Sequence, residues 1–178
     1  MEYKVRKFKN TDLRSVKNVL KRSVISAYLG GKITHQDILD SFNLKLMKKY
    51  ESNSKSNLPE MHNSKYFRYV LSYNNRIIGI CTIQVGINKN STTRFSILRQ
   101  LYLLPSFQGK GLGELLMKKS FTFSKTSRML TFLEVGRLNK KAINFYERNG
   151  FKDAKKRGLH AVGCKKIETI LMVKDQQT

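Results

Sequence analysis

The chain has 178 residues, of which 40% are hydrophobic and 26% are charged, so it is long enough to form one globular domain with its own core. Its 35 Lys and Arg residues outnumber its 12 Asp and Glu residues. The resulting net charge of +23 predicts attraction to anions, such as phosphorylated ligands or nucleic acids. No run approaches the ~18 apolar residues that span a bilayer, and the first ten residues hold no apolar signal sequence. We therefore expect a cytoplasmic protein with no membrane partner.

The residue types that most often bind metals are scattered along the sequence. Cys81 and Cys164 lie far apart, without the paired spacing of a zinc site, and His35, His62 and His160 are equally dispersed. We therefore expect no metal site and two free thiols in a reducing compartment.

The first third of the chain predicts a strand, two helices and a loop. Alternating apolar and polar residues predict a strand over 2–8, and Thr11 is expected to cap the helix that follows. A second helix is expected to begin at Thr34, because Asp37 stands at the third helical position, as in a capping box. The polar stretch 52–64 has the composition of a surface loop within one domain.

The remainder predicts a meander of strands followed by alternating helices and strands. The meander strands are expected at 65–73, 76–87 and 92–104. Beyond them we expect a helix at 113–123, a strand at 129–135, a helix at 139–150, and strands at 158–162 and 167–173. The basic run 155–157 is expected to be an exposed turn. This order predicts a single α+β domain over 1–178, built on a mixed sheet.

A glycine-rich stretch, QGKGLG at 108–113, separates the third meander strand from the next helix. Without side chains at its glycines, an anion can approach the backbone, and the N–H groups at the start of the helix point toward it. Its spacing is neither that of a P-loop nor that of a dinucleotide-binding loop. The setting nevertheless predicts a phosphate-bearing ligand; the alternative is a glycine turn that binds nothing.

A second candidate site lies one strand later, in FLEVGRLNKKAINFYERNGF at 132–151. Glu134 is expected on the strand face opposite Leu133 and Val135, and Tyr146 lies on the helix that follows. An acid and a phenol placed in this way can converge on one substrate. The same spacing also fits a salt bridge at the rim for Glu134 and an aromatic ring at the edge of the core for Tyr146.

Together the two stretches resemble the GNAT family, the Gcn5-related N-acetyltransferases. QGKGLG matches that family's Q/R-x-x-G-x-G/A loop, and LEV…N…A…FYE…GF matches its second conserved segment, so the resemblance covers 99–151. It implies a GNAT (acyl-CoA N-acyltransferase) fold, with a mixed, mostly antiparallel sheet flanked by helices, and acetyl-CoA as co-substrate. Because members of this family are often dimers, it also implies a homodimer as one candidate assembly.

The resemblance also implies a role for each matching position. The strand residues that would lend backbone groups to the pantetheine arm are Leu101, Tyr102 and Leu103. The residues that would surround the pyrophosphate are Gln108, Gly109, Lys110, Gly111, Leu112, Gly113 and Glu114. Asn139 lies where the family contacts the cofactor arm, and Tyr146 lies where it protonates the departing CoA thiolate.

Transfer of an acetyl group to an amine needs a base, because an alkylamine keeps its proton up to about pH 10. Many family members carry a carboxylate on the strand before the glycine loop, but this strand holds Arg94 and Arg99. Glu134 stands twelve residues before Tyr146, as in the branch that acetylates ribosomal-protein N-termini, where that Glu is the base. The resemblance therefore favours Glu134 as base, directly or through water, and Tyr146 as acid, in a direct transfer within a ternary complex.

Two branches of the family compete for the identity of the acceptor. The paired N-terminal helices and the tail IETILMVK are similar to PaiA-type polyamine acetyltransferases, whereas the spacing around Glu134 is similar to the ribosomal-protein branch. A chain of charge +23 attracts a polycation poorly, which favours an amine on an uncharged or acidic carrier. The acceptor is thus a polyamine-like small molecule or a protein or peptide amine.

Two functions of another class stay open. The basic surface could serve nucleic-acid or ribosome binding, although its Lys and Arg residues lack the aromatic ladder or helix motif of a dedicated binder. The other is an acetyl-CoA-binding regulator with little turnover, against which the presence of Glu134 and Tyr146 argues.

Overall fold

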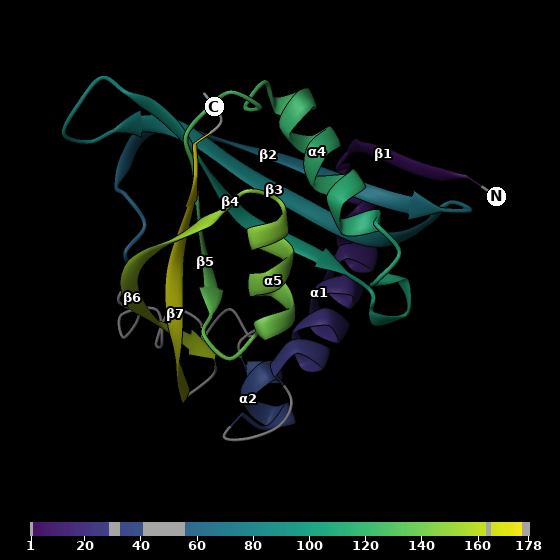
Figure 1. The fold of residues 1–178 in the computed structure, drawn as a ribbon. Coiled ribbons are helices and arrows are strands. Elements are labelled where there is room, and N and C mark those ends of the chain that lie inside the picture. Colours follow the sequence, from purple (N-terminus) through teal and green to yellow (C-terminus); the bar gives the residue numbers. More distant parts are fainter. Residues whose placement is uncertain (1, 29–32, 41–55, 163–164, 176–178) are drawn as a thin grey trace. The chain divides into compact units, whose positions relative to one another are not determined.

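The computed structural model describes residues 2–28, 33–40, 56–162 and 165–175. Its strands are β1 (Tyr3–Lys7), β2 (Met61–Tyr73), β3 (Arg76–Asn88), β4 (Arg94–Leu103), β5 (Thr131–Gly136), β6 (Lys152–Val162) and β7 (Lys165–Lys174). Its helices are α1 (Leu13–Tyr28), α2 (His35–Asp40), α4 (Leu112–Ser124) and α5 (Lys140–Arg148), with 3-10 turns η1 (Asn10–Asp12) and η2 (Pro105–Phe107). Figure 1 shows these elements. The α+β class with a mixed sheet, predicted from the order of elements, is confirmed.

The chain folds into two compact units. The first comprises Met1–Ser23, Pro59–Phe132 and Asp175–Thr178, and the second comprises Val24–Leu58 and Leu133–Lys174. α1 and β5 each contribute residues to both units, since the boundaries fall within these elements.

The first unit contains the antiparallel meander. Its strands follow the order β1-β2-β3-β4, and β4 then pairs in parallel with the start of β5 through Ser96–Thr131 and Ile97–Phe132. Helix α4 packs against these strands (Figure 1). Asn74 and Asn75, which lie between the strands expected at 65–73 and 76–87, form the turn between β2 and β3 with positive φ angles of 45° and 62°, as in a tight hairpin turn. The core between α4 and the strands includes Leu71, Ile83, Leu103, Leu116 and Met117.

A β-bulge in β4 changes which way its backbone groups face. Thr82 pairs with Gln100 and Ile83 pairs with Leu98, so Arg99 is the extra residue. Before the bulge, the Ser96 N–H donates toward β5, to Leu130 O at 3.0 Å. After it, the Leu104 N–H donates toward β3, to Ile78 O at 2.8 Å. In a regular strand, residues 96 and 104 would face the same neighbouring strand, because they are separated by an even number of positions. The backbone of Leu101 and the N–H of Leu103 therefore face away from β3.

The second unit is built around the hairpin of β6 and β7. The strand order is β5-β7-β6, and β6 and β7 pair antiparallel from Lys152–Val173 to Val162–Lys165. A small apolar cluster joins Ile33, Ile38 and Val162, with Tyr28 and Ile167 packed against it. The predicted capping box at the start of α2 is confirmed: the Thr34 N–H and Oγ donate to Asp37 Oδ2 at 2.9 and 2.7 Å.

Three local expectations are wrong. The loop expected at 52–64 ends earlier, because β2 already begins at Met61 and pairs there with Asn88; residues 52–55 lie outside the described residues. The run 155–157 lies within β6. The strand is irregular there, with a register shift between Asp153 and Arg157 and a φ of +60° at Lys155, and this irregularity accounts for the resemblance to a turn. Thr11 caps nothing; instead, η1 precedes α1 and Asp12 Oδ2 accepts the Lys9 N–H at 2.8 Å.

Asp12 provides a test of this N-terminal junction. It is buried and accepts two hydrogen bonds from the Arg6 guanidinium, at 2.7 and 2.8 Å, besides that from Lys9. We expect Asp12→Ala to lower the free energy of unfolding by about 2 kcal/mol, because the half-buried Arg6 charge loses its partner. Urea denaturation at neutral pH measures the loss.

The pH dependence of this effect has a defined sign. The hydrogen bonds from Arg6 hold the pKa of the Asp12 carboxyl below its usual range. Its stabilisation is therefore present above the unfolded pKa of about 3.9 and is lost as the pH falls through the lower folded pKa. Glu60→Gln, which removes an exposed ion pair with Lys89, is the control and should leave stability unchanged. Equal losses in both variants would contradict a special role for Asp12.

Cys81 provides a second test. Its thiol is fully buried in β3, and burial raises its pKa from 9.0 to about 12. Between these values the unfolded chain loses the proton while the folded chain keeps it, so stability falls as the pH rises, by up to about 1.4 kcal/mol per pH unit. Urea denaturation between about pH 8 and pH 11 should therefore show a steeper loss for the wild type than for Cys81→Ala. Parallel losses would contradict the buried neutral thiol.

Candidate active site

The glycine-rich loop turns the chain from β4 into α4. Pro105 begins η2, and Gly109 and Gly111 follow with φ angles of +75° and +72°, in the left-handed region that favours glycine. A Cβ atom at either glycine would meet no atom within 4 Å, so the requirement for glycine comes from the backbone angle and leaves open space beside the loop. The loop is therefore an accessible backbone surface in front of the helix.

The first turn of α4 presents backbone donors to this space. The Leu115 N–H makes the first helical hydrogen bond, to Gly111 O at 3.1 Å, so the N–H groups of Leu112, Gly113 and Glu114 precede the helical ladder. Such groups and the helix dipole favour an anion. The Glu114 carboxylate is held by Lys118, 2.5 Å away and one turn along, and this contact lowers its pKa. The exposed Lys110 ammonium lies 5.6 Å from the centre of the Phe107 ring.

Two side chains hold the end of β4 beside this loop. The Leu103 carbonyl accepts hydrogen bonds from Ser23 Oγ at 2.7 Å and from Gln108 Nε2 at 3.0 Å. Gln108 thus uses its side chain to attach the loop to the strand. The backbone groups that the bulge directs away from β3, those of Leu101 and the N–H of Leu103, belong to the same strand end and suit an extended ligand.

In the second unit, Glu134 is held by the segment that precedes β2. Leu133 and Val135 are buried and Glu134 is half-buried, as the strand alternation predicts. The Glu134 carboxylate accepts hydrogen bonds from Ser56 Oγ at 3.0 Å and from the Asn57 N–H at 2.7 Å. Both donors are neutral, and no Lys or Arg pairs with Glu134 in the described part of the chain.

Asn139 begins the helix that carries Tyr146. Its Oδ1 accepts the Ala142 N–H at 3.1 Å, and its side chain is also hydrogen-bonded to the Tyr28 hydroxyl, which bonds the Gly136 backbone as well. Burial raises the pKa of Tyr28, and a Cβ on Gly136 would lie 2.8 Å from its ring. Asn139 is thus engaged in structural contacts at a position where the family resemblance implies contact with the cofactor.

Tyr146 lies on α5 within a group of three aromatic rings. Its ring centre is 5.3 Å from that of Phe145 and 5.7 Å from that of Phe151, both in edge-on arrangements. The side chain is half-buried. Packing on two sides fixes the ring, which is what a proton donor at a defined position requires.

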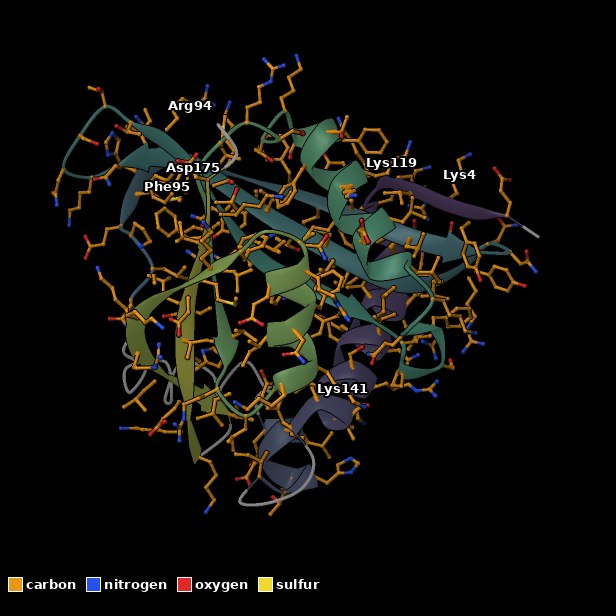
Figure 2. The ribbon with its side chains drawn as sticks, in the orientation of Figure 1. Lys4, Arg94, Phe95, Lys119, Lys141 and Asp175 are labelled. Carbon is orange, nitrogen blue, oxygen red and sulfur yellow. The ribbon has the colours of Figure 1, made fainter. Side chains whose placement is uncertain are left out.

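The surface is strongly basic because 35 Lys and Arg residues outnumber 12 Asp and Glu residues, and several of these acids are themselves held in ion pairs. Ion pairs engage Asp12, Glu60, Glu114, Asp153 and Glu168. Basic side chains such as Lys4, Arg94 and Lys119 of the first unit project into solvent (Figure 2). In the described ranges, no three His, Cys, Asp or Glu side chains are placed to hold a metal ion, and none of the helices could cross a membrane.

The structure brings together some predicted site residues and adds others. Leu101–Leu103 and Gln108–Glu114 are contiguous in the first unit, and Glu134, Asn139 and Tyr146 belong to the second. Sequence reasoning missed Ser23, Ser56, Asn57 and Tyr28, which hold predicted residues in place. No local sequence pattern indicates these four residues. Ser23, Ser56 and Asn57 bond residues at least 77 positions away, and Tyr28 acts through its hydroxyl alone.

The chain is similar to known proteins over the stretch that contains most of these residues. The model of the acetyltransferase (GNAT) family matches residues 35–151. The chain is 32% identical over 93 residues to an uncharacterized N-acetyltransferase of Archaeoglobus fulgidus, covering 46% of this chain and 63% of the relative. It is 30% identical over 87 residues to another from Methanocaldococcus jannaschii, covering 48% of this chain and 38% of the relative. The matches thus span less than two thirds of either relative.

Solved structures share the fold along nearly the whole chain. PaiA N-acetyltransferase from Thermoplasma acidophilum, solved with coenzyme A, has 22% identity and a TM-score of 0.68, covering 98% of this chain and 99% of that one. A ribosomal-protein alanine N-acetyltransferase from Escherichia coli has 18% identity and a TM-score of 0.63, covering 99% and 96%. At these identities the likeness is one of fold.

Asn139 offers a test of how α5 is positioned. Asn139→Ala should lower the free energy of unfolding by about 1–2 kcal/mol, because it removes the helix cap and the bond to Tyr28. Asn139→Asp keeps an oxygen that can accept the Ala142 N–H and should lose less than the alanine variant. Thermal and urea denaturation measure both. Equal losses in the two variants would show that the cap contributes nothing.

Proposed function

Because the chain belongs to the GNAT acetyltransferase family, we propose that it is an enzyme that transfers the acetyl group of acetyl-CoA to a primary amine. One observation carries the proposal: the turn through Gly109 and Gly111 opens the start of α4 and leaves three consecutive N–H groups for the pyrophosphate of the co-substrate. The +23 charge of the chain further favours a polyanionic ligand.

The residues of the first unit fit acetyl-CoA in two respects. The backbone of the loop binds the pyrophosphate through N–H groups that donate to it, because no Cβ at 109 or 111 occupies the space beside the loop. The pantetheine arm, which is extended and carries amide groups, lies along β4 and bonds the backbone of Leu101 and the N–H of Leu103. Ser23 and Gln108 occupy the Leu103 carbonyl, so this oxygen is not available to the cofactor.

Glu134 acts as the general base in this proposal. The acceptor enters as an ammonium ion, and its proton passes to the Glu134 carboxylate, through a water molecule or directly, before nitrogen attacks the thioester carbon. Neutral donors orient the carboxylate from Ser56 and Asn57, and no adjacent Lys or Arg in the described residues cancels its charge. A base that is oriented but not paired with a cation suits this step.

Tyr146 completes the transfer. Attack of the amine forms a C–N bond and places negative charge on the carbonyl oxygen, which a backbone N–H at the end of β4 stabilises. The C–S bond then breaks, the Tyr146 phenol gives its proton to the departing thiolate, and the proton that the new amide nitrogen loses restores the phenol. No covalent enzyme intermediate is needed. The rings of Phe145 and Phe151 hold the phenol in position for this transfer.

The acceptor is an amine on a small molecule or peptide. A polyamine is disfavoured by charge, because Lys165 and Lys166 begin β7 as exposed cations and the rest of the surface is basic. A single amine on a neutral or acidic carrier is attracted better. The solved PaiA and ribosomal-protein alanine enzymes both share the fold of this chain, so the likeness of fold does not distinguish between the two branches.

Turnover of acetyl-CoA measured by thiol release tests the proposal. The panel contains spermidine, spermine, lysine, aminoglycosides and short peptides with free N-termini. We expect turnover of one amine class, with kcat/KM lowered about 10²–10⁴-fold in Glu134→Gln and in Tyr146→Phe, because each variant removes a proton-transfer group. Binding of coenzyme A, measured by calorimetry, should be unchanged in Glu134→Gln.

Two matched variants control for nonspecific effects. Glu147→Gln changes an exposed acid on α5, and Tyr3→Phe removes an exposed phenol on β1; both should turn over like the wild type. Tight binding of acetyl-CoA without turnover of any amine would reject the enzymatic proposal in favour of a binding protein. Full activity in Glu134→Gln would reject Glu134 as base while keeping the reaction.

A further inference from the structure

Strand β2 has an open edge beyond the end of β1. β1 pairs with β2 from Tyr3–Tyr73 to Lys7–Tyr69, and the Phe8 N–H donates one more bond, to Arg68 O at 2.9 Å. β2 extends further back, to Met61, where it pairs with β3. Within the ranges that the structure describes, no strand pairs with this part of β2 on the side of β1.

The pairing identifies the backbone groups at this edge. Because Arg68 O faces β1 and alternate residues of a strand face the same way, the N–H of Arg68 and both backbone groups of Tyr66 face the open side. A register shift between His62 and Lys65, with a φ of +48° at Asn63, ends the regular edge in the other direction. The edge therefore offers residues 65–68 to a short extended segment.

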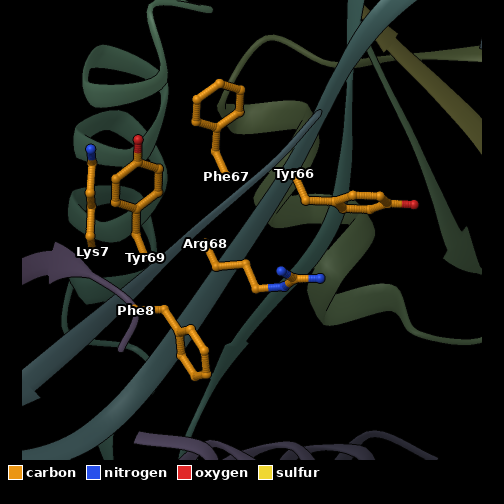
Figure 3. Close-up of a pocket in the computed structure, with 6 residues that line it drawn as sticks. All are labelled: Lys7, Phe8, Tyr66, Phe67, Arg68 and Tyr69. Carbon is orange, nitrogen blue, oxygen red and sulfur yellow. The ribbon is translucent and has the colours of Figure 1, made fainter. Parts of the chain in front are cut away.

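Side chains form a pocket of about 260 Å³ at the same place, lined by Lys7, Phe8, Tyr66, Phe67, Arg68 and Tyr69. Lys7, Phe67 and Tyr69 extend to one side of the strands, and Phe8 and Arg68 extend to the other (Figure 3). Tyr69 forms a buried floor, with its ring 5.7 Å from that of Phe123. Tyr66 is 51% exposed, and the Arg68 guanidinium lies 5.3 Å from its ring centre.

The charge at this edge has one sign. Lys7, Lys65 and Arg68 are exposed, and none of them forms an ion pair within the described residues. Glu60, the acid that precedes β2, is already paired with Lys89 at 2.7 Å. A second copy of this chain would bring another net charge of +23 and be repelled. Acidic side chains would meet three unpaired cations.

We propose that residues 65–68 and the adjoining pocket bind an extended, acidic segment of a partner protein by strand addition. The backbone of the segment bonds the open groups of Tyr66 and Arg68, its acidic side chains meet Lys7, Lys65 and Arg68, and an apolar side chain enters the pocket. The free strand edge is what favours a peptide over a nucleic acid, since its alternating donors and acceptors match a peptide backbone. This surface is independent of acetyl transfer.

Fluorescence anisotropy with N-acetylated peptide probes tests the proposal in the absence of acetyl-CoA. The first probe alternates Glu and Val, the second alternates Lys and Val, and the third replaces the Val residues by Pro, which removes backbone N–H groups. We expect the Glu-Val probe to bind, more weakly as salt is added, and the Lys-Val probe not to bind. The Glu-Pro probe should bind at least about fivefold more weakly than the Glu-Val probe.

Variants locate the binding. Arg68→Glu and Lys65→Glu should each weaken the Glu-Val probe at least about fivefold, since a contact charge is reversed. Arg128→Glu makes the same change of charge in the turn between α4 and β5 and should have little effect. Circular dichroism and the melting temperature verify that each variant is folded.

Several outcomes would overturn the proposal. Equal weakening by Arg68→Glu and Arg128→Glu would indicate attraction to overall charge alone. Binding of a single-stranded oligonucleotide at Arg68, with no binding of the Glu-Val probe, would assign the surface to nucleic acid. Self-association that Arg68→Glu abolishes would assign it to a second copy. Failure of every probe would leave the cations as protection of the edge against aggregation.

Discussion

The turn that carries the chain from β4 into α4 is the constraint on which the proposed site for the pyrophosphate depends. Two residues must adopt positive φ angles within three positions, and Gly109 and Gly111 do so without the steric cost that a side chain would add. The strand end before the turn is held by Ser23 and Gln108, which both bond Leu103 O. With one side of the turn held, the start of α4 keeps its N–H groups directed at open space, and an anion can be bound without rearrangement.

The few acidic side chains of this protein have different kinds of hydrogen-bond partner. Asp12 stabilises a junction by bonding Arg6 and Lys9, and other acids pair with neighbouring cations at the surface. Glu134 differs, since its bonds come from the Ser56 hydroxyl and the Asn57 N–H. Among the described residues no Lys or Arg pairs with the Glu134 carboxylate, so it is able to accept a proton, as the proposed reaction requires, in a chain whose net charge favours an anionic co-substrate.

The sequence predicted the elements well where one periodicity dominated. The three meander strands, α4 and α5 were confirmed with ends shifted by a few residues, and the motifs located the glycine loop. The early start of β2 and the length of β6 were missed, because bulges at 62–65 and 153–157 interrupt the alternation and introduce turn-like residues. The supports of the site were also missed, since Ser23 acts on Leu103 and Ser56 acts on Glu134 across long sequence separations that no spacing rule reaches.

The extra residue in β4 has a consequence for how this chain can change in length during evolution. Because Arg99 shifts the facing of every later residue in the strand, its deletion would turn the backbone of Leu101 toward β3 and present that of Tyr102 in its place. A single-residue deletion there would change which backbone groups at the end of β4 face away from β3, whereas the composition and hydrophobicity of the chain would hardly change. Insertions and deletions should therefore be tolerated in turns such as that between β3 and β4, and selected against between Leu98 and Leu103.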